Sequence, residues 1–169
     1  MTIEVRIARP TDIPGILAIA AQVQAFHADA YPDIFRPVPA EGLPEQPFRE
    51  AIAASAESVL VAMSYDELVG YARLERQTRP ESAIKYARAQ LYVHEIGVRA
   101  DRRRVGVGTR LMAEIRAIAL AEGLASIAIE AMASNISARN FYAAQGFHEQ
   151  RSVLVRPASA EGESRPPVP

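Results

Sequence analysis

The chain has 169 residues, of which 49% are hydrophobic, and its formal net charge is −1. This composition suits one globular domain and argues against binding nucleic acid or an anionic membrane through a general basic field. The absence of cysteine excludes disulfides, thiolate metal sites and a cysteine nucleophile. The short apolar runs, and a start without the apolar region of a signal peptide, predict a soluble cytoplasmic protein.

The predicted elements alternate between strands and helices. Residues 3–9 alternate apolar and polar side chains, as a half-buried strand does. A helix follows to residue 30, with Thr11 or Asp12 as its N-cap, and a proline-rich loop covers 31–46. The next predicted elements are a short helix over 48–56, strands over 58–63, 68–77 and 87–98, a helix over 107–122, a strand over 125–132, a helix over 134–145 and a strand over 147–156.

This order predicts one α/β domain with a mixed sheet over residues 1–156, in which antiparallel hairpins lead into a strand–helix–strand crossover. The tail over 157–169 is rich in Pro, Ser, Glu and Gly, so disorder is expected there. The histidines are scattered without ligand spacing, and no metal site is predicted.

Residues 99–115, "RADRRRVGVGTRLMAEI", place arginines and two glycines at the start of a predicted helix. The first turn of a helix has unpaired N–H groups and partial positive charge, which suit a phosphate. Gly106 and Gly108 let an anion approach the backbone, and Arg103 and Arg104 can add charge-assisted hydrogen bonds. The alternative is an ordinary glycine-rich turn beside solvated arginines.

Two common phosphate motifs do not fit this segment. The dinucleotide fingerprint needs a third glycine where Leu111 stands. A P-loop needs a lysine before Thr109, but that residue is Gly108. A dehydrogenase of the Rossmann type is therefore disfavoured.

A second motif, "NISARNFYAAQGF" over 135–147, follows the spacing N-x-x-A-x-x-F-Y-x-x-x-G-F. Together with Arg103-x-x-Gly106-x-Gly108, this chain resembles the GCN5-related N-acetyltransferases, the GNAT superfamily. The resemblance covers residues 3 to about 156. It implies a GNAT-like fold of mixed α/β (α+β) class, with a mostly antiparallel central sheet flanked by helices and a splayed strand pair forming an acetyl-CoA cleft. It also implies acetyl-CoA as cofactor and allows a homodimer.

The resemblance assigns the cofactor contacts mainly to backbone. The pantetheine arm would pair with the strand at Ile96, Gly97 and Val98. Asn135 would lie near this arm, cap the following helix, or do both. The residues expected at the pyrophosphate are Arg103, Arg104, Val105, Gly106, Val107, Gly108 and Thr109. Family members often have proline at the position of Ala100 and glycine at that of Arg104, so a somewhat different loop shape is expected.

Transfer of an acetyl group to an amine needs a proton acceptor, and the departing thiolate benefits from an acid. By resemblance Tyr142 is the predicted acid, with a purely structural role as the alternative. Glu95, then Glu130, then His94 are the candidate bases, and a water relay without a single base is also open. Neighbours on a strand face opposite sides, so His94 and Glu95 would share a face only at a bulge.

The resemblance places the acceptor near the first helix and its loop, where Phe26, His27, Tyr31 and Phe35 are the candidate contacts. Each residue taken singly also fits a packing role. A small-molecule amine is the expected acceptor. The alternatives are a protein N-terminus or lysine as acceptor, and a non-catalytic acyl-CoA-binding module on the same fold.

Overall fold

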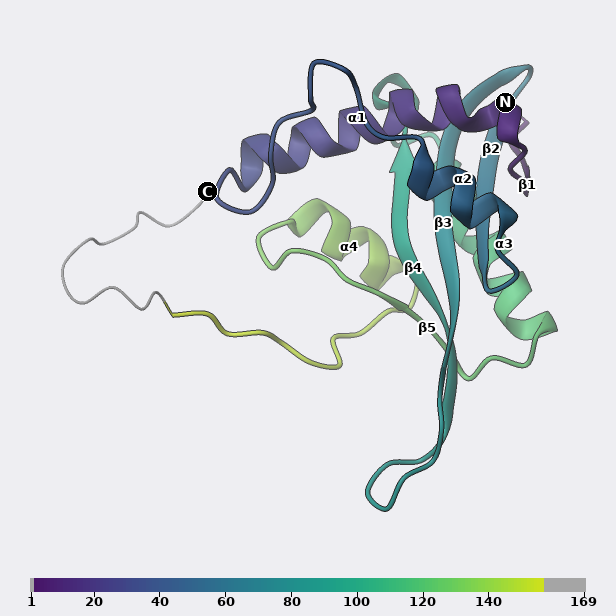
Figure 1. The fold of residues 1–169 in the computed structure, drawn as a ribbon, viewed down its shortest axis with the longest axis vertical. Helices are drawn as coiled ribbons and strands as arrows, with labels where there is room; N and C mark the ends of the chain where they lie inside the picture. The colour runs from purple at the N-terminus through teal and green to yellow at the C-terminus, as the bar shows by residue number, and fades with distance from the viewer. Residues whose placement is uncertain (1, 157–169) are drawn as a thin grey trace. The chain divides into compact units, whose positions relative to one another are not determined.

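A computed structural model describes residues 2–156, in two compact units that divide after Glu130 (Figure 1). The first unit contains β1 (Glu4–Ile7), η1 (Pro10–Asp12), α1 (Ile13–Ala30), α2 (Gln46–Ala53), β2 (Glu57–Ser64), β3 (Glu67–Arg79), β4 (Arg88–Val98), η2 (Ala100–Arg102), α3 (Val107–Ala121) and β5 (Ser126–Ile129). The second unit contains α4 (Ile136–Ala144). The predicted disordered tail, 157–169, lies outside the described residues.

The five strands form one sheet in the order β1-β2-β3-β4-β5. The first four strands pair antiparallel, and β5 pairs parallel with β4 after the crossover through α3. The parallel ladder joins Gln90–Val93 to Ser126–Ile129. Within residues 2–156, the end of β4 up to Val98 has no strand on that side. The mixed, mostly antiparallel sheet with a splayed strand pair is confirmed.

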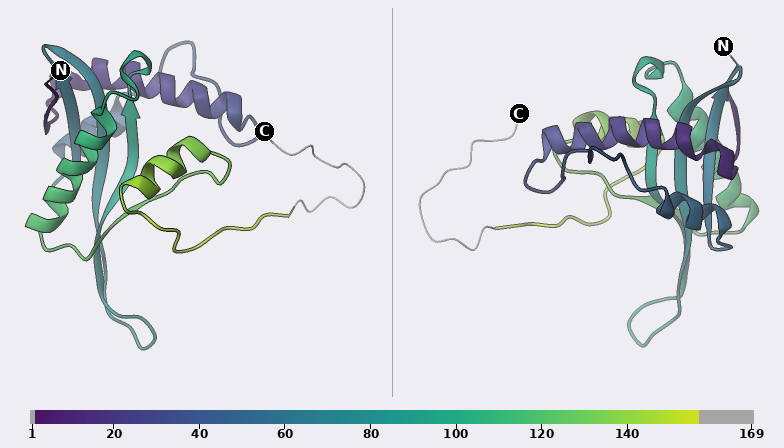
Figure 2. Two further views of the ribbon diagram at one scale, coloured as in Figure 1. Left: turned by 180° about the vertical axis from the view of Figure 1, so that it is seen from behind. Right: turned by 45° about the horizontal axis from the view of Figure 1, so that its top comes forward.

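Helices cover both faces of this sheet. Figures 1 and 2 show α1 and α2 over one face and α3 over the other. The core on the α1 face joins Ile16 and Ile19 of α1 and Phe48 of α2 to strand side chains such as Val61 and Tyr71. On the opposite face, α3 buries Val107, Leu111, Met112, Ile115 and Ala119, the spacing expected for a helix with one apolar side.

Two predicted strands differ from the structure. β5 ends at Ile129, so Glu130 lies just beyond the strand that was expected over 125–132. The strand predicted over 147–156 is wrong: these residues form no strand ladder among residues 2–156. Val153, Leu154 and Val155 suit a strand by composition, but a strand also needs a neighbour to pair with, and these side chains are exposed.

Gly97 of β4 makes room for the ring of Tyr71 on β3. The two residues are paired across the antiparallel ladder, and the ring is fully buried beneath α1. A Cβ atom on Gly97 would lie 2.5 Å from Cε1 of Tyr71 and 3.1 Å from Cγ2 of Ile19. Packing of α1 against β4 therefore requires the absence of a side chain at this position.

We expect the Gly97→Ala substitution to lower the free energy of unfolding by about 1–3 kcal/mol, because the added methyl group overpacks a filled core. Urea unfolding of the two proteins, analysed with a common slope, measures the difference. An unchanged midpoint would show that the Tyr71 ring and α1 move aside without penalty.

Candidate active site

The arginine-rich segment forms the loop between β4 and α3. Gly106 is the residue before α3, with a φ of 93°, and it has no side chain with which to cap the helix. The N–H groups of the first turn, from Val107 onward, therefore lack both helical partners and a side-chain cap. Their partial positive charge favours an anion at this helix start.

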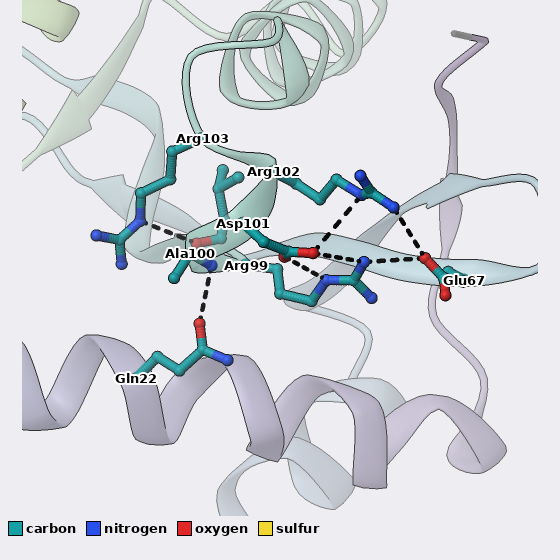
Figure 3. A network of polar contacts seen from close by, with 8 residues as sticks. Gln22, Glu67, Arg99, Ala100, Asp101, Arg102 and Arg103 are labelled. Carbon is teal, nitrogen blue, oxygen red and sulfur yellow. Dashed lines mark hydrogen bonds and ion pairs between the residues drawn. The ribbon is translucent and has the colours of Figure 1, made fainter.

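The arginines beside this helix start divide into two pairs. Arg99 contacts Glu67 at 2.9 Å and Asp101 at 2.7 Å. Arg102 also reaches Glu67, at 3.4 Å (Figure 3). These contacts lower the pKa of both carboxyl groups, chiefly through the hydrogen bonds from Arg99. Arg99 and Arg102 are thus neutralised by acids of the chain.

Arg103 and Arg104 have no acidic partner in the described part of the chain. The Nε atom of Arg103 donates to the carbonyl oxygen of Val98 at 3.3 Å, while Arg104 makes no hydrogen bond or ion pair there. Both side chains are exposed. The two arginines expected at the pyrophosphate are therefore the two of this group whose charge no acidic side chain within residues 2–156 compensates.

Arg104 has a left-handed backbone, with a φ of 64°. This corrects the expectation that a side chain here would give the loop a different shape: Arg104 takes a conformation that favours glycine. A non-glycine residue in this region is strained by roughly 1–2 kcal/mol. The loop thus keeps a glycine-like path while carrying an additional positive charge.

The open edge of β4 lies next to this loop. From Ile96 to Val98 the strand pairs with β3 on one side and has no strand on the other among the described residues. A free strand edge presents N–H and C=O groups that can pair with an extended ligand. An anion site and a free edge adjoin on one unit, and this fits a ligand with a pyrophosphate and an amide-bearing arm, as coenzyme A has.

A β-bulge in β4 brings His94 and Glu95 to the same face. Arg73 pairs with Glu95 and the next residue of β3 pairs with Val93, so His94 is the extra residue. Nε2 of His94 lies 2.9 Å from Oε2 of Glu75, and Oε1 of Glu95 lies 3.2 Å from Nε of Arg73. Arg73 and Glu75 are two apart on β3 and face the same side.

The carboxylate of Glu95 is held on both oxygens. The hydroxyl of Tyr71 donates to Oε2 at 2.8 Å, and Nε of Arg73 donates to Oε1. Burial raises the pKa of Tyr71, and the adjacent Glu95 raises it further, so this phenol stays a donor. Glu95 keeps a partly exposed side chain on the α1 face of the sheet, whereas Glu130 lies exposed after β5.

The four aromatic residues predicted at the acceptor site gather at the end of α1 and in the loop after it. The rings of His27 and Phe35 stack with centroids 4.8 Å apart. The ring centroids of Phe26 and Tyr31 lie 5.8 and 6.3 Å from that of His27. Burial lowers the pKa of His27, so its ring is neutral at neutral pH and does not repel a cationic amine.

The second unit contains the other motif. Oδ1 of Asn135 accepts a hydrogen bond from the N–H of Ala138 at 3.1 Å, so Asn135 is the N-cap of α4. Within this unit the Tyr142 ring lies 5.4 Å from Phe141 and 5.8 Å from Phe147, centroid to centroid. Burial raises the pKa of Tyr142 to about 12, which keeps its hydroxyl protonated.

The model of the acetyltransferase (GNAT) family matches residues 22–147, which include both motifs. The chain belongs to the GNAT family. It is therefore an N-acetyltransferase by family, and acetyl-CoA is the acetyl donor that this family uses. None of the curated proteins matches the chain.

Solved structures share the fold. A mutant of the BH1408 protein from Bacillus halodurans is 23% identical with a TM-score of 0.88, over 92% of this chain and 99% of that one. The aminoglycoside N-acetyltransferase AAC(6')-Iy in complex with CoA is 16% identical with a TM-score of 0.68, over 92% and 100% of the two chains. AAC(6')-Ih from Acinetobacter baumannii is 16% identical with a TM-score of 0.70, over 95% and 100%.

Two residues that contact the loop between β4 and α3 had no signal in the sequence. Glu67 lies at the start of β3, 35 residues before Arg102, and Gln22 lies in the middle of α1. Oε1 of Gln22 accepts a hydrogen bond from the N–H of Ala100 at 2.9 Å (Figure 3). Among residues 2–156, no cluster of acidic or histidine side chains is placed to hold a metal ion, and no helix is long and apolar enough to cross a membrane.

We expect Arg104→Gly to raise the free energy of unfolding of the ligand-free protein by about 1 kcal/mol, because glycine relieves the left-handed strain. Arg103→Gly is the matched control. It removes the same charge from the preceding position, where the backbone φ is −72° and a side chain causes no strain. The control should lose stability, because glycine adds freedom to the unfolded chain without relieving strain. Equal losses in both variants, measured by urea unfolding, would contradict the expected strain.

Proposed function

We propose that this chain acetylates a primary amine of a small molecule, with acetyl-CoA as the donor and direct attack of the amine in a ternary complex. The observation that carries the proposal is the helix start of α3, where uncapped amides meet the unpaired charges of Arg103 and Arg104. The free edge of β4 beside it supports an extended arm on the same ligand.

The residues that would hold the donor follow from this geometry. Arg103, Arg104 and the backbone from Val105 to Thr109 would bind the pyrophosphate, and the backbone of Ile96–Val98 would pair with the pantetheine arm. When bound, acetyl-CoA supplies an acetyl group activated as a thioester. By its place in the family motif, Asn135 is a further proposed donor contact in addition to its role as the N-cap of α4.

We assign proton uptake from the amine to Glu95. A free alkylammonium group has a pKa near ~10.4, so it must lose a proton before it can attack. The bonds from Tyr71 and Arg73 fix the orientation of the carboxylate without filling all of its lone pairs. His94 is engaged with Glu75, and Glu130 lies beyond the end of β5 at Ile129, so both rank below Glu95.

Tyr142 is the proposed acid for the departing sulfur. Its assignment rests on its position in the motif and on burial, which keeps a proton on Oη throughout the pH range of ordinary assays. The new bond forms between the amine nitrogen and the carbonyl carbon, and the carbon–sulfur bond breaks. The ammonium nitrogen loses two protons: Glu95 takes the first before attack, and the second leaves as the amide forms and replaces, through solvent, the proton that Tyr142 gives to the sulfur.

The acceptor is proposed to contact the aromatic cluster of Phe26, His27, Tyr31 and Phe35. Aromatic faces bind cations, and the neutral ring of His27 adds no repulsion. His27 lies beside the three other rings, and Tyr31 lies beside Phe35. We take such a compact aromatic cluster to suit a small molecule better than a long peptide. Neighbours in the same fold include proteins named as aminoglycoside N-acetyltransferases, which supports the same class of acceptor.

We expect CoA to bind the wild-type protein and not the Gly108→Trp variant, because a large side chain at the start of α3 blocks the approach to the backbone. Isothermal titration calorimetry measures both affinities. Leu120→Trp is the control, since Leu120 is exposed at the other end of the same helix. A folded wild-type protein that does not bind CoA would overturn the proposed function.

We expect Tyr142→Phe to lower kcat by about a hundredfold without changing the affinity for CoA, because it removes a proton donor and little bulk. Turnover is measured against a panel of polyamines, amino acids, aminoglycosides and peptides. Tyr86→Phe, at a tyrosine that is 90% exposed, controls for the loss of a hydroxyl. Unchanged kcat would remove Tyr142 from the mechanism, and turnover of peptides alone would contradict the small-molecule acceptor.

A further inference from the structure

The phosphate loop, defined here as residues 99–108, is bordered by acids that should oppose its function. Glu67 and Asp101 place two negative charges beside arginines at a proposed anion site. Like charges in the neighbourhood of a bound anion reduce its affinity. If the loop binds an anion, Glu67 and Asp101 must also favour binding in another way that outweighs this repulsion.

Glu67 connects two arginines that lie three residues apart. Its Oε2 atom accepts from Nη2 of Arg99 at 2.9 Å and from Nη2 of Arg102 at 3.4 Å. Figure 3 shows both guanidinium groups converging on this carboxylate from the loop. Glu67 of the β2–β3 hairpin thereby links the residue before the short helical turn η2 to the last residue of that turn.

Backbone contacts fix the same turn from two further directions. The N–H of Arg99 donates to the carbonyl oxygen of Val69 at 3.0 Å, and the N–H of Ala100 donates to Gln22 of α1. The N–H of Arg102 donates to the carbonyl oxygen of Arg99 at 2.9 Å. Residues 99–102 are thus anchored to β3 and α1 before the loop continues to the exposed residues 103–106.

The anchored arginines come first in the loop and the unpaired arginines follow them. Arg99 and Arg102 are occupied by Glu67 and Asp101, while Arg103 and Arg104 remain available for an anion. A loop that is already ordered loses less conformational freedom when it binds its ligand. Preorganisation of Arg103 and Arg104 is therefore an effect that can exceed the repulsion from one carboxylate.

We propose that Glu67 is a positioning residue for coenzyme A: it holds Arg99 and Arg102 so that Arg103, Arg104 and the first turn of α3 face the pyrophosphate. Glu67 touches neither substrate nor cofactor. The inference rests on the proposed function, because the ligand of the loop is taken to be CoA. It adds that an acidic residue distant in sequence increases the affinity for a polyanion.

The test compares two substitutions that remove the same charge from the same hairpin. Glu67→Gln removes the negative charge that pairs with Arg99 and Arg102 and leaves only the weaker acceptor of an amide oxygen. Asp66→Asn changes the adjacent residue, which is exposed and makes no hydrogen bond or ion pair with the described residues. Calorimetry with CoA at low salt gives the dissociation constant of each variant and of the wild type.

We expect Glu67→Gln to weaken CoA binding about three- to tenfold, since two surface ion pairs are lost. Asp66→Asn should leave the affinity unchanged or slightly increase it, because it removes only a repulsive charge. If Glu67 acted merely as a charge, both variants would shift in the direction of tighter binding. Equal affinities in the two variants would overturn the positioning role.

Hydrogen exchange without ligand supplies a readout that is independent of binding. In Glu67→Gln, amides over residues 99–108 should exchange faster than in Asp66→Asn, while those of β2 and α1 stay unchanged. Unchanged exchange over 99–108 would also overturn the proposal. A wild-type protein that fails to bind CoA would overturn the proposed function, whereas wild-type binding with matched variants overturns only the role of Glu67.

Discussion

The hydrogen bond from Tyr71 to Glu95 joins the hydrophobic core to the proposed chemistry. A buried phenol needs an acceptor, and Glu95 supplies it at 2.8 Å. The ring reaches that position only because Gly97 has no side chain, and Ile19 of α1 closes over the same space. The packing of α1 on β4 and the orientation of the carboxylate thus depend on one contact.

Around the phosphate loop, some arginines are paired with acidic side chains and others are not. Four arginines lie within six residues, and a bare cluster of this kind would repel itself. Pairing Arg99 and Arg102 with acids leaves the local excess of positive charge on Arg103 and Arg104, next to the uncapped start of α3. The net charge of the whole chain is only −1, and this is consistent with the arrangement. The proposed binding of the pyrophosphate relies on two arginines and the start of one helix, and it needs no general positive charge.

Most elements of the first unit follow from sequence periodicity. The stripe of α3 and the alternation of β2 and β3 are local signals that the sheet and its core reinforce. The strand expected over 147–156 shows the limit of such signals, since pairing depends on a neighbour that the local pattern does not name. The sequence predicted Arg103 and Arg104 as cofactor residues, and among residues 2–156 no acidic side chain pairs with either of them.

Other features of the site arise from contacts that are distant in sequence or from backbone geometry. The bulge at His94 is an insertion in register and has no marker in composition. The left-handed backbone of Arg104 is one that its side chain disfavours. The path of the loop is therefore determined by the positions of β4 and α3, which it joins. Glu67 and Gln22 meet the loop only because the hairpin and α1 are packed around it.

Helix α1 connects the two halves of the proposed site within the first unit. It packs Ile19 near Gly97, holds the N–H of Ala100 through Gln22, and ends at the aromatic cluster around His27. With a rise of 1.5 Å per residue, Gln22 and His27 are about 7.5 Å apart along the axis. A continuous helix deforms little over this length, so the separation between the phosphate loop and the acceptor cluster is fixed by the core. In the proposed site, variation in acceptor preference falls to the loop after α1, whose side chains can change without moving Gln22 or its contact with Ala100.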